Sequence, residues 1–270
     1  MKYKLLVLDV DGTLLNDAKE ISKRTLASLL KVQQMGIRVA LASGRPTYGL
    51  MPLAKTLELG NYGGFIISYN GGQIINAQNG EILFERRINP EMLPYLEKKA
   101  RKNNFAIFTY HDDTILTDSS DNEHVRAEAN LNNLKIIQEE EFSTAIDFAP
   151  CKCILVSNDE EALKDLEEHW KKRLDGTLDV FCSESYFLEV VHCGIDKANT
   201  LRVLLPHLDI TREEVIAIGD GVCDVNMLQV AGLGIAMGHA QDSVKVCADY
   251  VTASNEEDGV AQSVEKLILA

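Results

Sequence analysis

The amino-acid sequence predicts an α/β fold in which a domain built on a parallel sheet is interrupted by an inserted α+β module. Apolar strands alternate with amphipathic helices in the first third of the chain, and the same alternation returns from Asp196 onward. Between these two stretches the predicted strands are short and lie close together in the sequence, which is typical of local antiparallel pairing. A length of 270 residues leaves room for one to two domains.

The first third begins with the continuous apolar run 4–10, which ends in acidic residues and is typical of a buried parallel strand. Ser22 is placed to cap a following helix, and Gly36 is placed to end it. Two further buried strands are predicted at 37–42 and 65–68.

Periodicity and turn residues also predict the helices and strands of the rest of the chain. In the middle we predict helices at 90–102 and 159–174, a charged helical stretch before residue 134, and strands at 105–109, 114–117, 152–156, 178–182 and 187–191. At the end we predict helices at 197–208, 224–231 and from 260, and strands at 215–218, 233–236 and 250–252. The predicted domains are a core of residues 1–83 and 191–270 and an insert of residues 84–190.

Composition narrows the possible partners and the compartment. The 41 acidic and 27 basic residues give a net charge of −14, which argues against nucleic acid or an anionic membrane as a partner. The six cysteines form no CxxC pair, which is typical of reduced cysteines in a cytoplasmic protein. No stretch is apolar enough for a membrane span, and the apolar run before Asp9 is too short for a signal peptide.

A pair of carboxylates follows the first strand, in the segment Asp9-Val10-Asp11-Gly12-Thr13. Ligands of open parallel sheets bind beyond the carboxyl ends of the strands, where these two side chains would lie. Two like charges at one site are costly unless a cation offsets them, and carboxylate oxygens suit Mg²⁺. An aspartate can also attack phosphorus. The alternative interpretation is an ordinary surface turn rich in Asp and Gly.

Three later segments supply complementary groups. Ser43 and Gly44 follow the second strand, where a small hydroxyl and backbone N–H groups can approach a phosphate. Asp220 and Asp224 follow another buried strand and add two carboxylates. Lys197 begins a helix and would supply a cation beside them. Each segment also has an ordinary interpretation: a common helix entry, an acidic turn and a solvated lysine.

Taken together, these segments resemble the haloacid dehalogenase-like hydrolase superfamily, and most closely its Cof-type sugar-phosphate phosphatases with a type IIB cap. The resemblance covers essentially the whole chain and implies a Rossmann-like core with an inserted α+β cap that selects the substrate. The four motifs are Asp9-x-Asp11-Gly12-Thr13, Ser43-Gly44-Arg45-Pro46, Lys197 and Gly219-Asp220…Asp224.

The resemblance also implies roles for the motif residues. Asp9 would be the nucleophile that takes the phosphoryl group, and Asp11 would protonate the leaving alcohol and then activate water. Ser43, Gly44 and Lys197 would bind the transferring phosphoryl group.

The resemblance further implies Mg²⁺ as the cofactor. Asp9, the backbone carbonyl of Asp11 and Asp220 would hold the ion, and Asp224 would orient a water on it. The ion and Lys197 would offset the repulsion between a phosphate dianion and the attacking carboxylate.

Three positions depart from the family pattern. Cys223 stands where the family has an Asn that helps to hold phosphate, Ala198 where a Gly follows the lysine, and His239 where this branch often has Asn. A thiol beside phosphate-binding groups raises the hypothesis of an oxidation-sensitive site, against that of a tolerated small residue. We interpret His239 as a loop histidine.

The sequence therefore predicts a cytoplasmic, Mg²⁺-dependent phosphatase for small phosphorylated metabolites, such as sugar phosphates. A phosphomutase and a phosphosugar-binding regulatory protein with little turnover are the alternatives. The predicted insert holds 23 acidic and 13 basic residues. An acidic lid would repel extra phosphates, so we expect a monophosphate to be preferred over a bisphosphate.

Overall fold

The computed structural model describes residues 2–270, which divide into two compact units. The first, which we call the core unit, contains Met1–Gly44, Leu50–Phe84 and Asp196–Ala270. The second, the inserted unit, contains Arg45–Gly49 and Glu85–Ile195. The second boundary of the inserted unit falls a few residues after the one drawn from the sequence, because the strand that ends at His192 belongs wholly to this unit.

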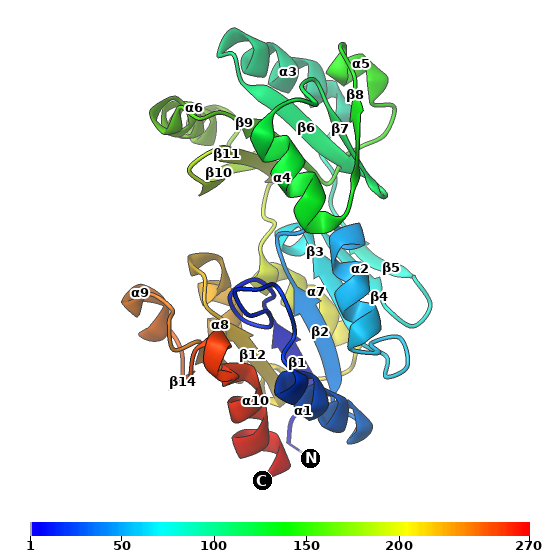
Figure 1. The fold of residues 1–270 in the computed structure, drawn as a ribbon, viewed down its shortest axis with the longest axis vertical. Coiled ribbons are helices and arrows are strands. Elements are labelled where there is room, and N and C mark those ends of the chain that lie inside the picture. Colours follow the sequence, from blue (N-terminus) through cyan, green and yellow to red (C-terminus); the bar gives the residue numbers. More distant parts are fainter. Residues whose placement is uncertain (1) are drawn as a thin grey trace. The chain divides into compact units, whose positions relative to one another are not determined.

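The core unit is built on an eight-stranded sheet in the order β14-β13-β12-β1-β2-β3-β4-β5. The strands from β14 to β3 are parallel, and β4 pairs antiparallel with β3. Their bounds are β1 Leu5–Leu8, β2 Arg38–Ala42, β3 Phe65–Ser68, β4 Gln73–Asn76, β5 Ile82–Glu85, β12 Val215–Gly219, β13 Leu233–Ala236 and β14 Tyr250–Val251. The first strand of the chain thus lies in the interior of the sheet (Figure 1).

Helices cover both faces of this sheet. Because side chains of a strand alternate between its faces, Leu6 and Leu8 of β1 join one apolar cluster and Leu5 and Val7 join the other. The first cluster includes residues of α1, α2 and α10, and the second includes residues of α7, α8 and α9. The helix bounds are α1 Lys23–Gln34, α2 Thr47–Thr56, α7 Lys197–His207, α8 Val225–Val230, α9 Asp242–Lys245 and α10 Gly259–Val264.

The inserted unit has a six-stranded sheet in the order β10-β11-β9-β6-β7-β8. All its pairs are antiparallel except β7 with β8, which are parallel and joined through a helix. The strands are β6 Ala106–His111, β7 Thr114–Thr117, β8 Lys135–Gln138, β9 Lys152–Val156, β10 Leu178–Glu184 and β11 Phe187–His192. The helices are α3 Leu93–Lys102, α4 Glu123–Asn132, α5 Phe142–Ala145 and α6 Glu160–Arg173.

One face of this second sheet carries the apolar core of the inserted unit. Side chains of α3, α5 and α6 pack there against alternate residues of the central strands, with Trp170 fully buried. A buried ion pair joins Lys152 of β9 to Glu189 of β11, with Nζ 3.1 Å from Oε2. The register pairs Lys152 with Val191 and Ile154 with Glu189, so the two charged residues are diagonal neighbours on the sheet.

Short helical turns connect these elements. The 3₁₀ turns are Tyr69–Gly71, Pro90–Met92, Arg212–Glu214, Val222–Asp224 and Asn255–Glu257, and a π-helical turn covers Glu265–Leu269. The predicted cap of α1 is confirmed, because the Ser22 side chain accepts a hydrogen bond from the Thr25 N–H at 3.1 Å.

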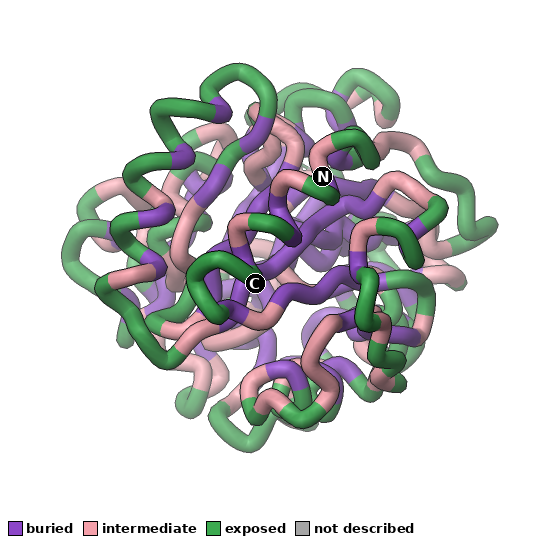
Figure 2. The backbone as a smooth tube through the Cα atoms, turned by 90° about the horizontal axis from the view of Figure 1, so that it is seen from above, coloured by how far each residue is buried: buried purple, intermediate pink, exposed green. Residues whose placement is uncertain are grey.

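Burial along the chain follows the secondary structure. In Figure 2 the coiled segments alternate between buried and exposed residues, as helices with one apolar face do. Within residues 2–270, none of the helices combines the length and the apolar character that crossing a bilayer requires.

The predicted fold class, an α/β protein with a parallel-sheet core and an inserted α+β unit, is confirmed. Two elements of the inserted unit were not predicted, the edge strand β8 and the short helix α5. Three of the four residues of β8 are exposed, the polar Lys135 and Gln138 among them, so the segment lacks the apolar alternation by which strands are recognised.

Candidate active site

The carboxylate at the end of β1 is almost fully buried. Asp9 directly follows the strand, and its N–H donates a hydrogen bond of 2.9 Å to the Ile218 carbonyl, which continues the pairing with β12. Three residues on, Gly12 has a left-handed φ of +82°, and a Cβ there would lie 2.6 Å from Oδ2 of Asp220. Glycine is therefore required at this position both for the backbone conformation and for the close approach of Asp220.

Lys197, the first residue of α7, links two carboxylates of the site. Its Nζ lies 2.6 Å from Oδ1 of Asp9 and 2.7 Å from Oδ1 of Asp224, and its side chain is 2% exposed. Burial alone would lower the pKa of this ammonium group, but Asp224 and Asp9 outweigh it and hold the pKa well above its ordinary range. The lysine is thus a fixed positive charge at the ends of the strands.

The single ammonium group does not fully offset the negative charge around Asp9. Burial, followed by the neighbouring carboxylate of Asp224, raises the pKa of Asp9 to about 8, although Lys197 acts in the opposite direction. Ionising Asp9 in the metal-free protein therefore carries a free-energy cost, which a further cation at the site would reduce.

The loop after β12 supplies the other carboxylates. Asp224 is fully buried, and its Oδ2 accepts hydrogen bonds from the N–H groups of Asp220 and Gly221 at 3.2 and 2.9 Å. Asp220 is half-buried, and its Oδ1 accepts a hydrogen bond of 2.7 Å from the Thr13 hydroxyl. Asp224 thus shapes the loop that positions Asp220, while Thr13 orients the Asp220 carboxylate.

The donor set at this site fits a hard divalent cation. Carboxylate oxygens of Asp9, Asp220 and Asp224 all lie within 4.8 Å of one another. Three carboxylates against one lysine leave a local excess of negative charge, and oxygen donors of this kind suit Mg²⁺. The carboxylate of Asp11 is not in this cluster, and its predicted contribution through the backbone carbonyl stays a prediction.

The predicted phosphate-binding segment lies at the end of the strand next to β1. Ser43 is buried, its N–H donates to the Ile67 carbonyl at 2.9 Å, and its carbonyl accepts from the Asn70 N–H at 2.9 Å. At Gly44, a Cβ would lie 3.1 Å from the amide oxygen of Asn70. The backbone of this segment is therefore fixed by β3 and by the turn that follows β3.

The structure brings in residues to which no role was given from the sequence. Lys19 forms an ion pair with Asp11, Nζ to Oδ1 2.9 Å, and His239 lies 3.6 Å from Oδ2 of Asp220. Thr13 belonged to a motif, so the sequence contained a signal for it. Lys19 lies in a loop with a positive φ, and no sequence pattern marks its approach to Asp11.

The thiol of Cys223 is less acidic than an ordinary cysteine thiol. The residue as a whole is exposed, but local burial around its thiol raises the pKa to about 12, and the lowering effect of Lys197 is countered by Asp224, Asp9 and Asp220. Peroxide reacts with thiolates rather than thiols, so the raised pKa favours a tolerated small residue over an oxidation-sensitive site, whereas the exposure of Cys223 keeps it within reach of peroxide.

The chain belongs to the haloacid dehalogenase-like hydrolases, because the model of this family matches residues 6–264. It is similar to a haloacid dehalogenase-like hydrolase from Bacteroides thetaiotaomicron, with 49% identity, a TM-score of 0.95, and coverage of 99% of this chain and 100% of that one. A second relative is the 5-amino-6-(5-phospho-D-ribitylamino)uracil phosphatase YcsE of Bacillus subtilis, 30% identical over 98% of this chain and 96% of that protein.

The fold is also that of a solved subclass IIB sugar phosphatase, which is 24% identical over 99% of this chain and 100% of that one, with a TM-score of 0.82. The predicted family is confirmed, as is the predicted class of enzyme, a phosphatase of the haloacid dehalogenase-like hydrolases.

Proposed function

We propose that this enzyme is a cytoplasmic, Mg²⁺-dependent phosphatase for small sugar phosphates that works through an aspartyl-phosphate on Asp9. The observation that carries the proposal is the convergence of Asp9, Lys197 and Asp224 at hydrogen-bond distance, with Asp220 completing the carboxylate cluster. Nucleophile, cation and oxygen donors are then in one place, as phosphoryl transfer requires.

In the first half-reaction an oxygen of Asp9 forms a bond to phosphorus while the ester P–O bond breaks, and Asp11 gives its proton to the departing alcohol. In the second, Asp11 takes a proton from water as the water oxygen attacks phosphorus, which releases inorganic phosphate and frees Asp9. Lys197, Ser43 and Gly44 hold the phosphoryl oxygens throughout. Bound Mg²⁺, held by Asp9, Asp11 and Asp220, would stabilise the negative charge on the transferring group.

Asp224 has a positioning role in this proposal. Both of its oxygens are used within the protein, one by Lys197 and one by two backbone N–H groups. Its carboxylate therefore fixes the ammonium of Lys197 and the loop that carries Asp220, and in this way supports the metal-binding groups.

Substrate selection is assigned to the inserted unit, and the sugar phosphate class is supported by the relatives. YcsE is named for a phosphorylated ribityl compound, and the fold is shared with a subclass IIB sugar phosphatase. The acidic surplus of the inserted residues supports a monophosphate with a neutral sugar over a bisphosphate.

A panel of sugar phosphates and nucleotides, assayed for phosphate release with and without Mg²⁺, tests the proposal. We expect Mg²⁺-dependent release from sugar monophosphates, faster than from the matching bisphosphates. Isomerised sugar phosphate without free phosphate would identify a phosphomutase instead, and tight binding without release would identify a regulatory protein.

The nucleophile is tested by Asp9→Asn. The amide is nearly the same size as the carboxylate, so the variant should fold and should lose at least about a thousandfold in kcat. Substantial turnover in a correctly folded variant would exclude Asp9 as the nucleophile.

A further inference from the structure

A hollow of about 370 Å³ lies beside α7 and α8, the two helices that follow Asp196 and Asp224. Its volume is within the range of small-molecule sites. Two arginines, two amides and two aliphatic side chains line it, namely Arg202, Leu205, Arg212, Asn226, Gln229 and Val230. None of these six is a residue to which we assign catalysis or metal binding.

The lining is basic although the protein is acidic. Arg202 donates one N–H to Oδ1 of Asn199 at 2.5 Å, and Nε of Arg212 lies 3.6 Å from Oε1 of Glu213, longer than a hydrogen bond. A guanidinium group carries five N–H donors, so each arginine keeps donors for a ligand. The amides of Asn226 and Gln229 add neutral donors, and the lining includes no carboxylate.

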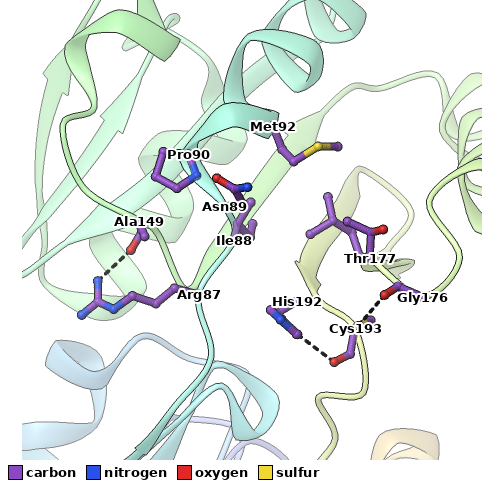
Figure 3. Close-up of a pocket in the computed structure, with 11 residues that line it drawn as sticks. Arg87, Ile88, Asn89, Pro90, Met92, Ala149, Gly176, Thr177, His192 and Cys193 are labelled. Carbon is purple, nitrogen blue, oxygen red and sulfur yellow. Dashed lines mark hydrogen bonds between the residues drawn. The ribbon is translucent and has the colours of Figure 1, made fainter.

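A cavity of similar size in the inserted unit shows what distinguishes this hollow. That cavity, of about 320 Å³, is lined by residues such as Ile88, Met92 and Thr177, and by Arg87 (Figure 3). The Arg87 guanidinium donates to both carboxylate oxygens of Glu85 and to the Ala149 carbonyl. Its charge is thus compensated inside the protein, which gives that cavity no preference for an anion.

Hydrogen bonds connect the hollow to the start of α7, whose first residue is Lys197. Asp196 caps α7 through the Asn199 N–H, and Asn226 of the hollow donates to Oδ2 of Asp196 at 3.4 Å. Arg202 in turn donates to the side chain of Asn199. One lining residue, Asn226, therefore contacts the cap of the helix that begins at Lys197, and Arg202 contacts Asn199 in its first turn.

We propose that this hollow binds a small metabolite carrying phosphate or carboxylate groups, and that the bound anion adjusts the position of Lys197. Paired arginines bind such groups through charge-assisted hydrogen bonds. A ligand that drew Arg202 and Asn226 toward itself would change the hydrogen bonds that both make at the start of α7. The binding stands independently of the proposed function, whereas the effect on turnover rests on it.

The test uses the full chain without metal, with malonate and inorganic phosphate as separate probes for the two anion chemistries. Thermal unfolding is followed for wild type, for Arg202→Gln/Arg212→Gln and for the matched control Arg38→Gln, which removes an exposed arginine elsewhere in the core unit. We expect either probe to raise the unfolding temperature of wild type and of the control. In the double variant the apparent affinity should fall by about tenfold or more.

A response to malonate alone would assign the hollow to carboxylates, and an arginine-dependent response to phosphate alone would assign it to phosphates. Equal shifts in the double variant and wild type, or no shift in either, would overturn the proposed site. For the second half of the proposal, the effective probe should change the rate of p-nitrophenyl phosphate hydrolysis more in wild type than in the double variant, in which only inhibition at the active site by the product, phosphate, remains. Equal changes of rate in the two proteins at saturating probe would overturn the effect on Lys197.

Thermal shifts do not require turnover. A chain that hydrolysed no phosphate ester would refute the proposed function and would leave the test of anion binding intact.

Discussion

The Nζ atom of Lys197 lies 2.6 Å from Oδ1 of Asp9, although 188 positions separate the two residues in the chain. The contact is buried and is shared with Asp224. It joins the start of α7 to the end of β1, so the ammonium group contributes to the stability of the core unit as well as to the charge balance of the site.

Lys197→Met should therefore lower the free energy of unfolding as well as turnover. Removing one partner of a buried ion pair leaves the other charge uncompensated, which costs about 3–5 kcal/mol. Urea denaturation without metal measures the loss, with Lys55→Met, an exposed lysine of α2, as the control. A Lys197 variant as stable as the control would show that the contact contributes no net stability.

The raised pKa of Asp9 predicts a pH dependence for the metal-free protein. The pKa rises from an ordinary value of 3.8 to about 8, so the folded state binds this proton more tightly than the unfolded state. The stability gained from this group is complete below about pH 4 and is lost as the pH rises to about 8. Denaturation at several pH values should show this loss in wild type, and a smaller loss in Asp9→Asn.

The same proton competes with a metal ion for Asp9. Apparent Mg²⁺ affinity should strengthen by up to about tenfold per pH unit below pH 8 and then level off, because ion binding displaces one proton. Calorimetric titration between pH 6 and pH 9 measures it in wild type. An affinity independent of pH over this range would place the ion away from Asp9.

The ion pair of the inserted unit predicts a contrast between buried and exposed lysines. Lys152→Met removes the ammonium group that pairs with the buried carboxylate of Glu189 and should lower the free energy of unfolding by about 3–5 kcal/mol. Lys135→Met breaks an exposed pair with Asp113 and should cost less than about 1 kcal/mol. Replacing Lys152 and Glu189 together by Met and Leu should recover most of the loss. A double variant no more stable than Lys152→Met would show that the loss comes from packing.

The raised pKa of the Cys223 thiol predicts that oxidation of this residue does not control the activity of the enzyme. With the pKa of its thiol at about 12, hydrogen peroxide should inactivate wild type and Cys223→Ser at the same rate. Residual activity after timed exposure measures both rates. Protection by the serine variant would show that the thiolate forms in spite of the surrounding carboxylates.

Much of the core unit could be predicted from the sequence, because its decisive signals are local. The apolar run that becomes β1 ends at Asp9, and Ser22 is a typical cap for α1, so the strand, the carboxylate at its end and the helix start can be predicted without tertiary information. The edge strand β8 could not be predicted, because edge strands are partly polar and their pairing partners lie elsewhere in the chain.

The candidate active site could likewise be predicted only where its signals are local in the sequence. Motif spacing predicts Asp9, Lys197 and Asp220 as candidates one at a time, but it does not contain the information that one ammonium group binds two carboxylates. The ion pair of Lys19 with Asp11 and the raised pKa of Cys223 likewise depend on distances across the fold. Each is a property of tertiary structure, which local patterns do not contain.

The pairing of β1 with β12, in which Leu5 lies opposite Val215, has a consequence for biosynthesis. During translation β1 leaves the ribosome before the inserted unit, but its partner on one side is made only after all of Glu85–Ile195 has been synthesised. The inserted unit is continuous apart from the short segment Arg45–Gly49, so it can fold before β12 is available to pair with β1. Contacts this distant in sequence are slow to form, so we expect the nascent core to expose its apolar strands and to depend on chaperones during this interval.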